Sequence, residues 1–166
     1  MSGLATPLIL AATEPLDSIF RSVNSYPYLA PTTIQGNPEA TSDADLAAGA
    51  RQVLDELYAR ELGDIRELFE VRRAQGRALV DVADVARAAT YGAVDTVLVD
   101  IDEVVPGSID EETGAVTLSP AATANRYGVV DEIARRTWLA GGRVLAVRQD
   151  DIPGQGSCAA ILRHRI

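Results

Sequence analysis

The residues best suited to chemistry are two aspartates that follow an apolar stretch, Asp100 and Asp102 in the sequence TVLVDIDEV (residues 96–104). An aspartate at the end of a buried strand can act as a nucleophile on phosphorus, and a second one two residues later can act as acid and base beside magnesium. Asp150 and Asp151 could supply a downstream metal pair. The spacing therefore raises the hypothesis of a magnesium-dependent phosphotransferase.

This pattern resembles the haloacid-dehalogenase type of phosphotransferase, but three features of the sequence count against it. The chain contains no lysine to neutralise a phosphate, only 66 residues follow Asp100 although the motif normally opens its domain, and Glu103 stands where a glycine is usual. Short motifs also match by chance. We therefore favour acids at the solvent end of a strand, and keep the phosphotransferase as an alternative.

All 15 basic residues are arginines, so Schiff-base chemistry and a phosphate-loop lysine are excluded. The net charge of −9 disfavours nucleic acid as a partner of the whole chain. The arginines are nevertheless concentrated near the C-terminus, and five of them are candidates for a binding face: Arg126, Arg135, Arg136, Arg143 and Arg148. An RNA-binding module that uses this arginine patch (residues 126–148) is a second alternative, although a solvated face is the simpler interpretation.

Cys158 is the only cysteine and His164 the only histidine, so neither an internal disulfide nor a zinc cluster can form. Cys158 begins an apolar run, which predicts a buried and unreactive thiol. His164 falls in the same predicted strand, where contact with the backbone is the ordinary role. We predict no cofactor and no metal centre.

The first part of the chain combines a short strand, a helix and an irregular linker. Residues 7–12 (PLILAA) predict a buried strand, and residues 16–23 a helix. Proline and glycine crowd residues 26–41, which indicates a domain boundary there. A long helical pattern begins at Ser42, with Asp45 as a capping partner, and stops at Gly76.

The rest of the chain alternates helices and strands, which favours a sheet covered by helices. A helix is expected over residues 79–90, and the apolar, β-branched run 96–105 predicts a central strand. Residues 106–119 predict an exposed loop or hairpin, and residues 130–138 a helix with a buried stripe that includes Trp138. Two strands, 143–147 and 158–165, enclose a polar turn; they should be antiparallel if adjacent.

Several of these motifs occur in an order that resembles one family. A helix leading into Gly-Ala-Val before the central strand (residues 89–99), a Val-Asp-Glu helix ending in Gly-Gly before a strand (residues 130–147), and GQGSCAAILRHR (residues 154–165) are typical of the C-terminal domain of class 1 archaeo-eukaryotic peptide chain release factors. The resemblance covers residues 42–166 and is closest to the bacterial branch of the superfamily, which includes ribosome-rescue relatives.

The resemblance implies a three-layer α/β/α sandwich with a central mixed sheet, of the kink-turn-binding ribosomal protein type. A long helix and an N-terminal strand–helix remnant precede the sandwich. Residues 1–41 then correspond to the tail of the preceding middle domain and the linker, and residues 42–166 to the C-terminal domain. In the family, a Gly-Gly-Gln loop of the middle domain promotes peptidyl-tRNA hydrolysis, and this sequence lacks that loop. Pro153-Gly154-Gln155-Gly156 is instead predicted to be a tight turn.

The function that the resemblance implies is an interaction domain for translation termination or ribosome rescue, non-catalytic by itself. Its expected partner is a protein such as a translational GTPase, or the ribosome. No apolar run reaches the ~18 residues of a membrane span, so we expect a cytoplasmic protein and no membrane partner. We expect a fragment or a truncated gene product, either monomeric or weakly dimeric through the strand edge of residues 7–12.

Overall fold

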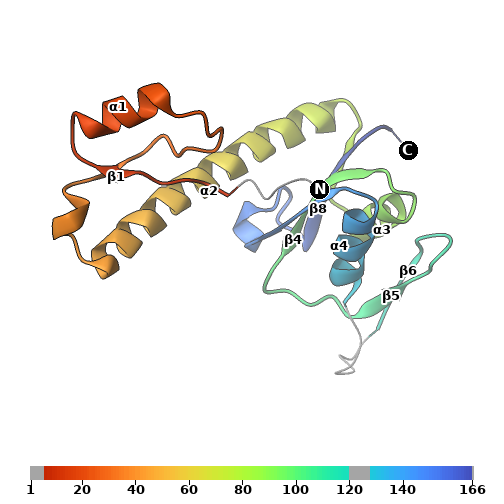
Figure 1. Ribbon diagram of the computed structural model, residues 1–166. Coiled ribbons are helices and arrows are strands. Elements are labelled where there is room, and N and C mark those ends of the chain that lie inside the picture. The colour runs from red at the N-terminus through yellow and green to blue at the C-terminus, as the bar shows by residue number, and fades with distance from the viewer. Residues whose placement is uncertain (1–5, 120–127, 166) are drawn as a thin grey trace. The chain divides into compact units, whose positions relative to one another are not determined.

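The structure is a computed structural model that describes residues 6–119 and 128–165 (Figure 1). The chain divides into two compact units, the first ending at Gly63 and the second beginning at Asp64. The long helix α2, Asp43–Ala74, contributes to both units. Each unit is described by itself.

The first unit contains a short parallel pairing between the segments that precede and follow helix α1. Strand β1 (Ala11–Ala12) pairs in parallel with β2 (Ile34–Gln35), and Leu8 forms a further bridge with Leu29. The predicted strand over residues 7–12 is therefore present only as a two-residue strand and one bridge. Helix α1 (Leu16–Val23) has the predicted bounds, and the 3-10 turn η1 (Pro38–Ala40) lies in the predicted linker.

Helix α2 begins and ends where its local signals predict. The Ser42 hydroxyl accepts the Asp45 N–H at 3.2 Å and donates to its carboxylate at 2.7 Å. At the other end, Gly76 adopts a φ of +66°, and the N–H groups of Gly76 and Arg77 donate to the carbonyls of Arg73 and Arg72. This pairing is the glycine-terminated Schellman arrangement, in which the last carbonyls of the helix find donors.

The second unit contains a mixed four-stranded sheet in the order β3-β8-β4-β7. Its strands are β3 (Ala78–Leu79), β4 (Val94–Asp100), β7 (Arg143–Val147) and β8 (Cys158–Leu162). β4 is parallel to β7 and antiparallel to β8. The mixed sheet of the prediction is confirmed. The last two strands are not adjacent, because the apolar strand β4 takes the central place between them.

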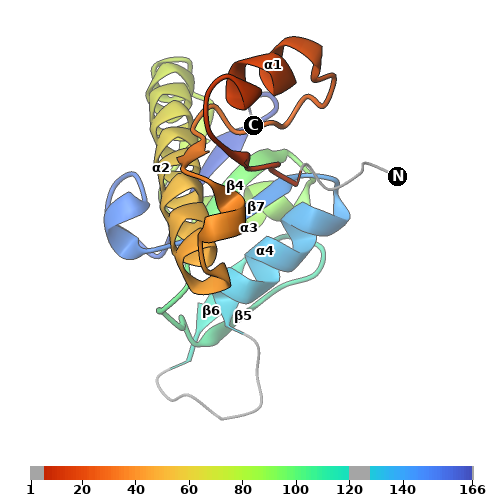
Figure 2. The ribbon, with the colours of Figure 1, turned by 60° about the vertical axis from the view of Figure 1, so that its left-hand side comes forward.

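Helices cover both faces of this sheet, so the predicted α/β sandwich is confirmed. Helices α3 (Val82–Thr90) and α4 (Val129–Leu139) pack together on one face, over a core that includes Val97 and Ile133. The part of α2 from Asp64 onwards lies along the other face, and its Phe69 is buried (Figure 2). A hairpin of β5 (Gly107–Ile109) and β6 (Val116–Leu118) extends from this unit, as predicted for residues 106–119.

Two predictions about the helices of this unit are wrong. The helix expected from residue 79 begins at Val82, because the Asp81 carboxylate accepts the N–H groups of Ala83 and Asp84 and so caps it there. The two residues Ala78–Leu79 instead pair with β8 as an edge strand. Trp138, expected in the core, is 70% exposed. The buried stripe of α4 ends at Thr137, and the next residue lies about 100° further around the helix, on its outer side.

Candidate protein-interaction site

The two aspartates of the Asp-x-Asp motif form a turn that ends β4. The Asp100 carboxylate accepts the backbone N–H of Asp102 at 2.9 Å, and the Asp100 N–H donates to the Ser157 carbonyl at 3.0 Å. Asp102 is exposed, whereas Asp151 accepts a hydrogen bond from Arg66 at 2.8 Å. Over residues 6–119 and 128–165, no group of three His, Cys, Asp or Glu side chains could hold a metal ion. The described residues thus do not assemble the carboxylate cluster that the phosphotransferase alternative requires.

The other two candidate reactive groups are placed differently by the structure. Cys158 is buried, as predicted, and this burial raises the pKa of its thiol to about 12, with the charges of Asp81 and Glu103 adding to the effect. The thiol therefore stays protonated at neutral pH and is a poor nucleophile. β8 ends at Leu162, so His164 lies beyond the strand in which it was predicted, and it is exposed.

The glycine–glutamine segment is a tight turn, as predicted. Gly154 and Gln155 both have positive φ, +85° and +53°, and the Gln155 N–H donates to the Ile152 carbonyl at 3.0 Å. A Cβ atom at Gly154 would come within 3.1 Å of the Val80 side chain. The backbone conformation and the close approach to Val80 explain why glycine precedes the glutamine here.

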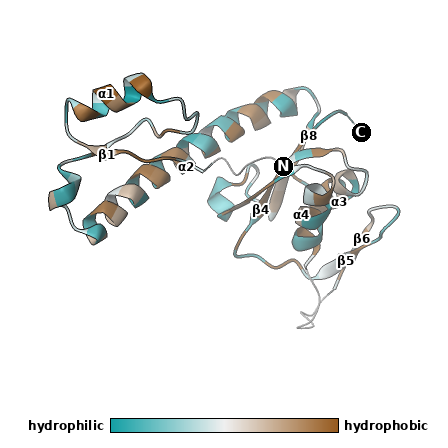
Figure 3. Cartoon of the chain, viewed as in Figure 1, coloured by the Kyte–Doolittle hydropathy of each residue, from teal (hydrophilic) through white to brown (hydrophobic). Residues whose placement is uncertain are grey.

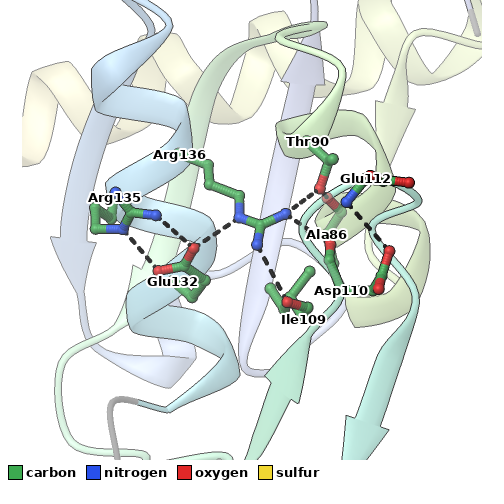
Figure 4. A network of polar contacts seen from close by, with 8 residues as sticks. All are labelled: Ala86, Thr90, Ile109, Asp110, Glu112, Glu132, Arg135 and Arg136. Carbon is green, nitrogen blue, oxygen red and sulfur yellow. Dashed lines mark hydrogen bonds and ion pairs between the residues drawn. The ribbon is translucent and has the colours of Figure 1, made fainter.

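Two of the predicted arginines, Arg135 and Arg136, lie on α4 and share one carboxylate (Figure 4). Arg135 donates to both Glu132 oxygens, at 2.7 and 2.8 Å, and Arg136 donates to one of them at 2.7 Å. Hydrogen bonds from Arg135 and then Arg136, with their positive charges, lower the pKa of Glu132 to about 2. This carboxylate is therefore ionised at any physiological pH.

Arg136 is a connector within the fold. Its guanidinium donates to the Thr90 hydroxyl of α3 at 2.7 Å, and to the Asp110 and Ile109 carbonyls at 3.0 and 3.2 Å (Figure 4). Only 11% of its side chain is exposed. Because most of its donors already have partners inside the unit, Arg136 is better suited to holding the hairpin against α3 and α4 than to contacting a ligand.

The remaining predicted arginines do not join this pair on α4. Arg143 opens β7 and Arg148 follows its end, so roughly 16 Å of strand separates their backbones. Both are exposed. Arg126 lies outside the described residues. The use of the five arginines in RNA binding stays a prediction.

The structure adds a surface that sequence reasoning missed. Arg135, Trp138 and Leu139 are spaced i, i+3 and i+4, so they share one side of α4, which we call the α4 outer face. Trp138 is 70% exposed and Leu139 64%. Trp138 fits the periodicity of the stripe, so the only signal in the sequence was that two large apolar residues stand side by side at the end of the helix, close to Gly141.

A cleft of about 500 Å³ lies beside the α4 outer face. Its lining comes from α3, the hairpin and α4, and comprises Ala89, Thr90, Gly92, Glu111, Arg135, Arg136, Leu139 and Ala140. Arg163 donates to the Gly92 and Ala140 carbonyls at 3.2 and 2.9 Å, which ties two of these lining segments to the end of β8. An exposed tryptophan and an arginine on one helix face, next to a cleft, are typical of a surface that binds another protein.

The comparisons with known proteins concern both units. The family model of bacterial archaeo-eukaryotic release factor family 11 matches residues 1–60. No curated protein sequence matches the chain significantly. Among residues 6–119 and 128–165, no helix is long and apolar enough to cross a membrane.

Three solved structures share the fold over nearly the whole chain. A model of ribosome-bound archaeal Pelota and ABCE1 matches with a TM-score of 0.59 and 22% identity, over 95% of this chain and 43% of the matched one. S. cerevisiae Dom34, a translation termination-like factor, matches with a TM-score of 0.55 and 15% identity, over 96% and 47%. Archaeoglobus fulgidus Pelota matches with a TM-score of 0.51 and 18% identity, over 96% and 49%.

The chain thus spans less than half the length of the structures that it matches. The family model matches the first 60 residues, whereas the motifs that predicted the family lie in residues 42–166. The structural match to ribosome-bound Pelota covers both regions. Residues 1–60 are thus similar to a release-factor family, and the chain as a whole shares the fold of Pelota and Dom34.

Proposed function

We propose that this chain acts in translation termination or ribosome rescue as an interaction domain that is non-catalytic by itself. The release-factor family match and the Pelota-like fold support the setting. The α4 outer face, with exposed Trp138 and Leu139 beside Arg135, is the single observation that supports protein docking as its task.

The partner that we propose is a translational GTPase, engaged on the ribosome. Dom34 interacts with Hbs1, and the matched Pelota belongs to a ribosome-bound assembly with ABCE1. An exposed tryptophan offers a large apolar contact area with few rotatable bonds, and Arg135 at its side supplies a charge for orientation. Such residues provide most of the binding energy in many protein interfaces.

The test is a binding titration of the full chain with purified ribosomes and translational GTPases, separately and together. We expect Trp138→Ala and Leu139→Ala each to weaken binding by about tenfold or more, as hot-spot truncations do. Leu118→Ala is the matched control, because Leu118 is 65% exposed and Leu139 is 64% exposed. The control variant should bind within about twofold of the wild type.

Trp138 is the only tryptophan of the chain, so it also reports on its own environment. Fluorine NMR of chain labelled with fluorotryptophan should show one resonance that shifts when the partner is added. Absence of binding by the wild type, or equal losses for Leu139→Ala and Leu118→Ala, would contradict docking through the α4 outer face.

A further inference from the structure

The residues around the end of α2 and those that follow β8 form one surface that is rich in arginine. Arg165 donates to the Gln75 carbonyl at 2.7 Å. Arg77, in turn, donates to the Leu162 carbonyl at 3.0 Å. Both segments are hydrophilic (Figure 3). The arginines of this surface, which we call the basic cluster, are Arg72, Arg73, Arg77, Arg163 and Arg165.

The basic cluster has few acidic partners. Neither residues 71–80 nor residues 152–166 contain an aspartate or a glutamate. Arg73 forms an ion pair with Glu70 at 3.8 Å. Over residues 6–119 and 128–165, the other four arginines of the cluster form no ion pair. The surface is therefore strongly positive, although the net charge of the chain is −9.

Helix ends explain only part of this arrangement. The C-terminal end of a helix carries partial negative charge, and Arg165 and Arg163 bond carbonyls that follow α2 and α4. A guanidinium has five N–H donors, however, and within the described residues Arg165 makes one hydrogen bond and Arg163 makes two. Both side chains are exposed. The cluster thus presents guanidiniums that are held in place and still have donors for an anion.

We propose that the basic cluster binds the phosphate backbone of RNA. Guanidinium groups bind phosphate through paired, parallel hydrogen bonds. Residues 72–78 and 163–165 contain no large apolar residue, and only Val71 and Val80 flank the first of these segments. Protein interfaces usually have an apolar centre, as the α4 outer face does with Trp138. A phosphate backbone offers charge without apolar surface, so RNA fits the cluster better than an acidic protein does.

The carboxylates that follow β4 and β7 are too far away to cancel the cluster. Arg163 lies at the start of β4, where its N–H donates to the Ala93 carbonyl at 2.9 Å. Asp100 ends this strand of 7 residues, and Asp150 follows the parallel strand β7. Roughly 20 Å of strand separates the two ends. Because salt screens charges over about 8 Å, only Asp95, near the start of β4, acts at close range.

Fluorescence anisotropy of a labelled RNA duplex of about 20 base pairs, in about 50–200 mM salt, tests the proposal. For the wild type, log K should fall against log salt with a slope of about −4. Arg163→Gln/Arg165→Gln should weaken binding by about tenfold or more and reduce the slope by about 2. Arg51→Gln/Arg60→Gln is the matched control, because it removes the same charge from exposed arginines of the first unit.

A second variant and a competitor keep the test independent of folding. Arg72→Gln/Arg73→Gln changes side chains that bond only the Gln75 and Glu70 side chains, so the fold should be unaffected, and RNA binding should again weaken. Polyglutamate should displace the RNA poorly. Unchanged affinity in both cluster variants, or an equal loss in the control, overturns the proposal. Equally effective displacement by polyglutamate overturns it in favour of an acidic protein.

RNA is the expected nucleic acid because the proposed function places the chain on the ribosome, and this part of the inference rests on that function. A DNA duplex that binds more tightly than the RNA duplex would overturn the assignment to RNA. A chain that binds a translational GTPase but not the RNA duplex would overturn the role of the basic cluster alone. A chain that binds the RNA duplex but neither ribosomes nor a GTPase would support the cluster and contradict the proposed function.

Discussion

Helices α1 and α4 are attached to their units by the same device and yet differ in what they bury. In each, an arginine bonds an acid four residues earlier, a threonine hydroxyl and at least one backbone carbonyl: Arg21 with Asp17 and Thr33, and Arg136 with Glu132 and Thr90. Helix α4 adds a buried apolar stripe, and α1 does not. The arginine anchor is thus compatible with either face of a helix turned outward.

This difference separates two kinds of exposed apolar surface. On α4, Trp138 and Leu139 are additions to a helix whose stripe is already packed, so their exposure leaves the fold intact. On α1, the whole stripe (Leu16, Ile19, Phe20 and Val23) is exposed and contributes little to folding of the monomer. Truncation of Trp138 or Leu139 should therefore leave the stability of the fold unchanged. The apolar stripe of α1 should contribute to stability only when a partner covers it.

The two helices should differ most when one isoleucine on each is truncated. Ile133 is fully buried, so Ile133→Ala should lower the free energy of unfolding by about 2–5 kcal/mol. Ile19 is 54% exposed, so Ile19→Ala should change it by no more than about 0.5 kcal/mol. Urea unfolding of the two variants and the wild type measures both changes. Equal losses would show that α1 packs its apolar side in the monomer.

Removal of the two anchoring arginines should give a smaller difference in the free energy of unfolding. The two variants should also differ in how much of the chain unfolds. Arg136→Met leaves carbonyls of the hairpin without their donor and should cost about 2–4 kcal/mol in global unfolding. Arg21→Met should cost about 1 kcal/mol and should act locally, by releasing α1 while the second unit stays folded. Hydrogen exchange of the α1 and α4 amides distinguishes the two outcomes. Arg135→Met, at a side chain that is 59% exposed, is the control and should cost less than about 1 kcal/mol.

The last prediction is a pH dependence centred on Glu132, which should be smaller than the effect of Arg136→Met. Its pKa is lowered from 4.5 to about 2, chiefly by the hydrogen bond from Arg135. A carboxylate with a lowered pKa stabilises the fold above its ordinary pKa, and this stabilisation is lost as the pH falls from 4.5 towards 2. We expect the wild type to exceed Glu132→Gln by about 1–2 kcal/mol at pH 7. The difference should shrink as the pH falls from 4.5 and vanish below about 2 in urea unfolding. A difference independent of pH would rule out this role.

Prediction from the sequence succeeded where local signals suffice. The bounds of α1 and β7, the Ser42 cap of α2 and its end at Gly76 all follow from residues within a few positions of one another. The edge strand β3 was missed because two residues carry no periodicity, and β8 alone selects them for pairing. The sequence predicted the candidate site less well than the fold. The exposure of Trp138 and the internal role of Arg136 depend on segments far away in the chain.

The sequence by itself determined which residues share a face, since the periods of helix and strand are local properties of the backbone. It determined the mixed sheet, the buried thiol of Cys158 and the family resemblance as well. Only the tertiary structure decided which way each face points. The apolar side of α1 is outward because Thr33 and the Ala30 carbonyl, on a distant segment, bind Arg21 and draw the polar side inward. Trp138 faces outward because the buried stripe of α4 ends at the preceding residue, Thr137.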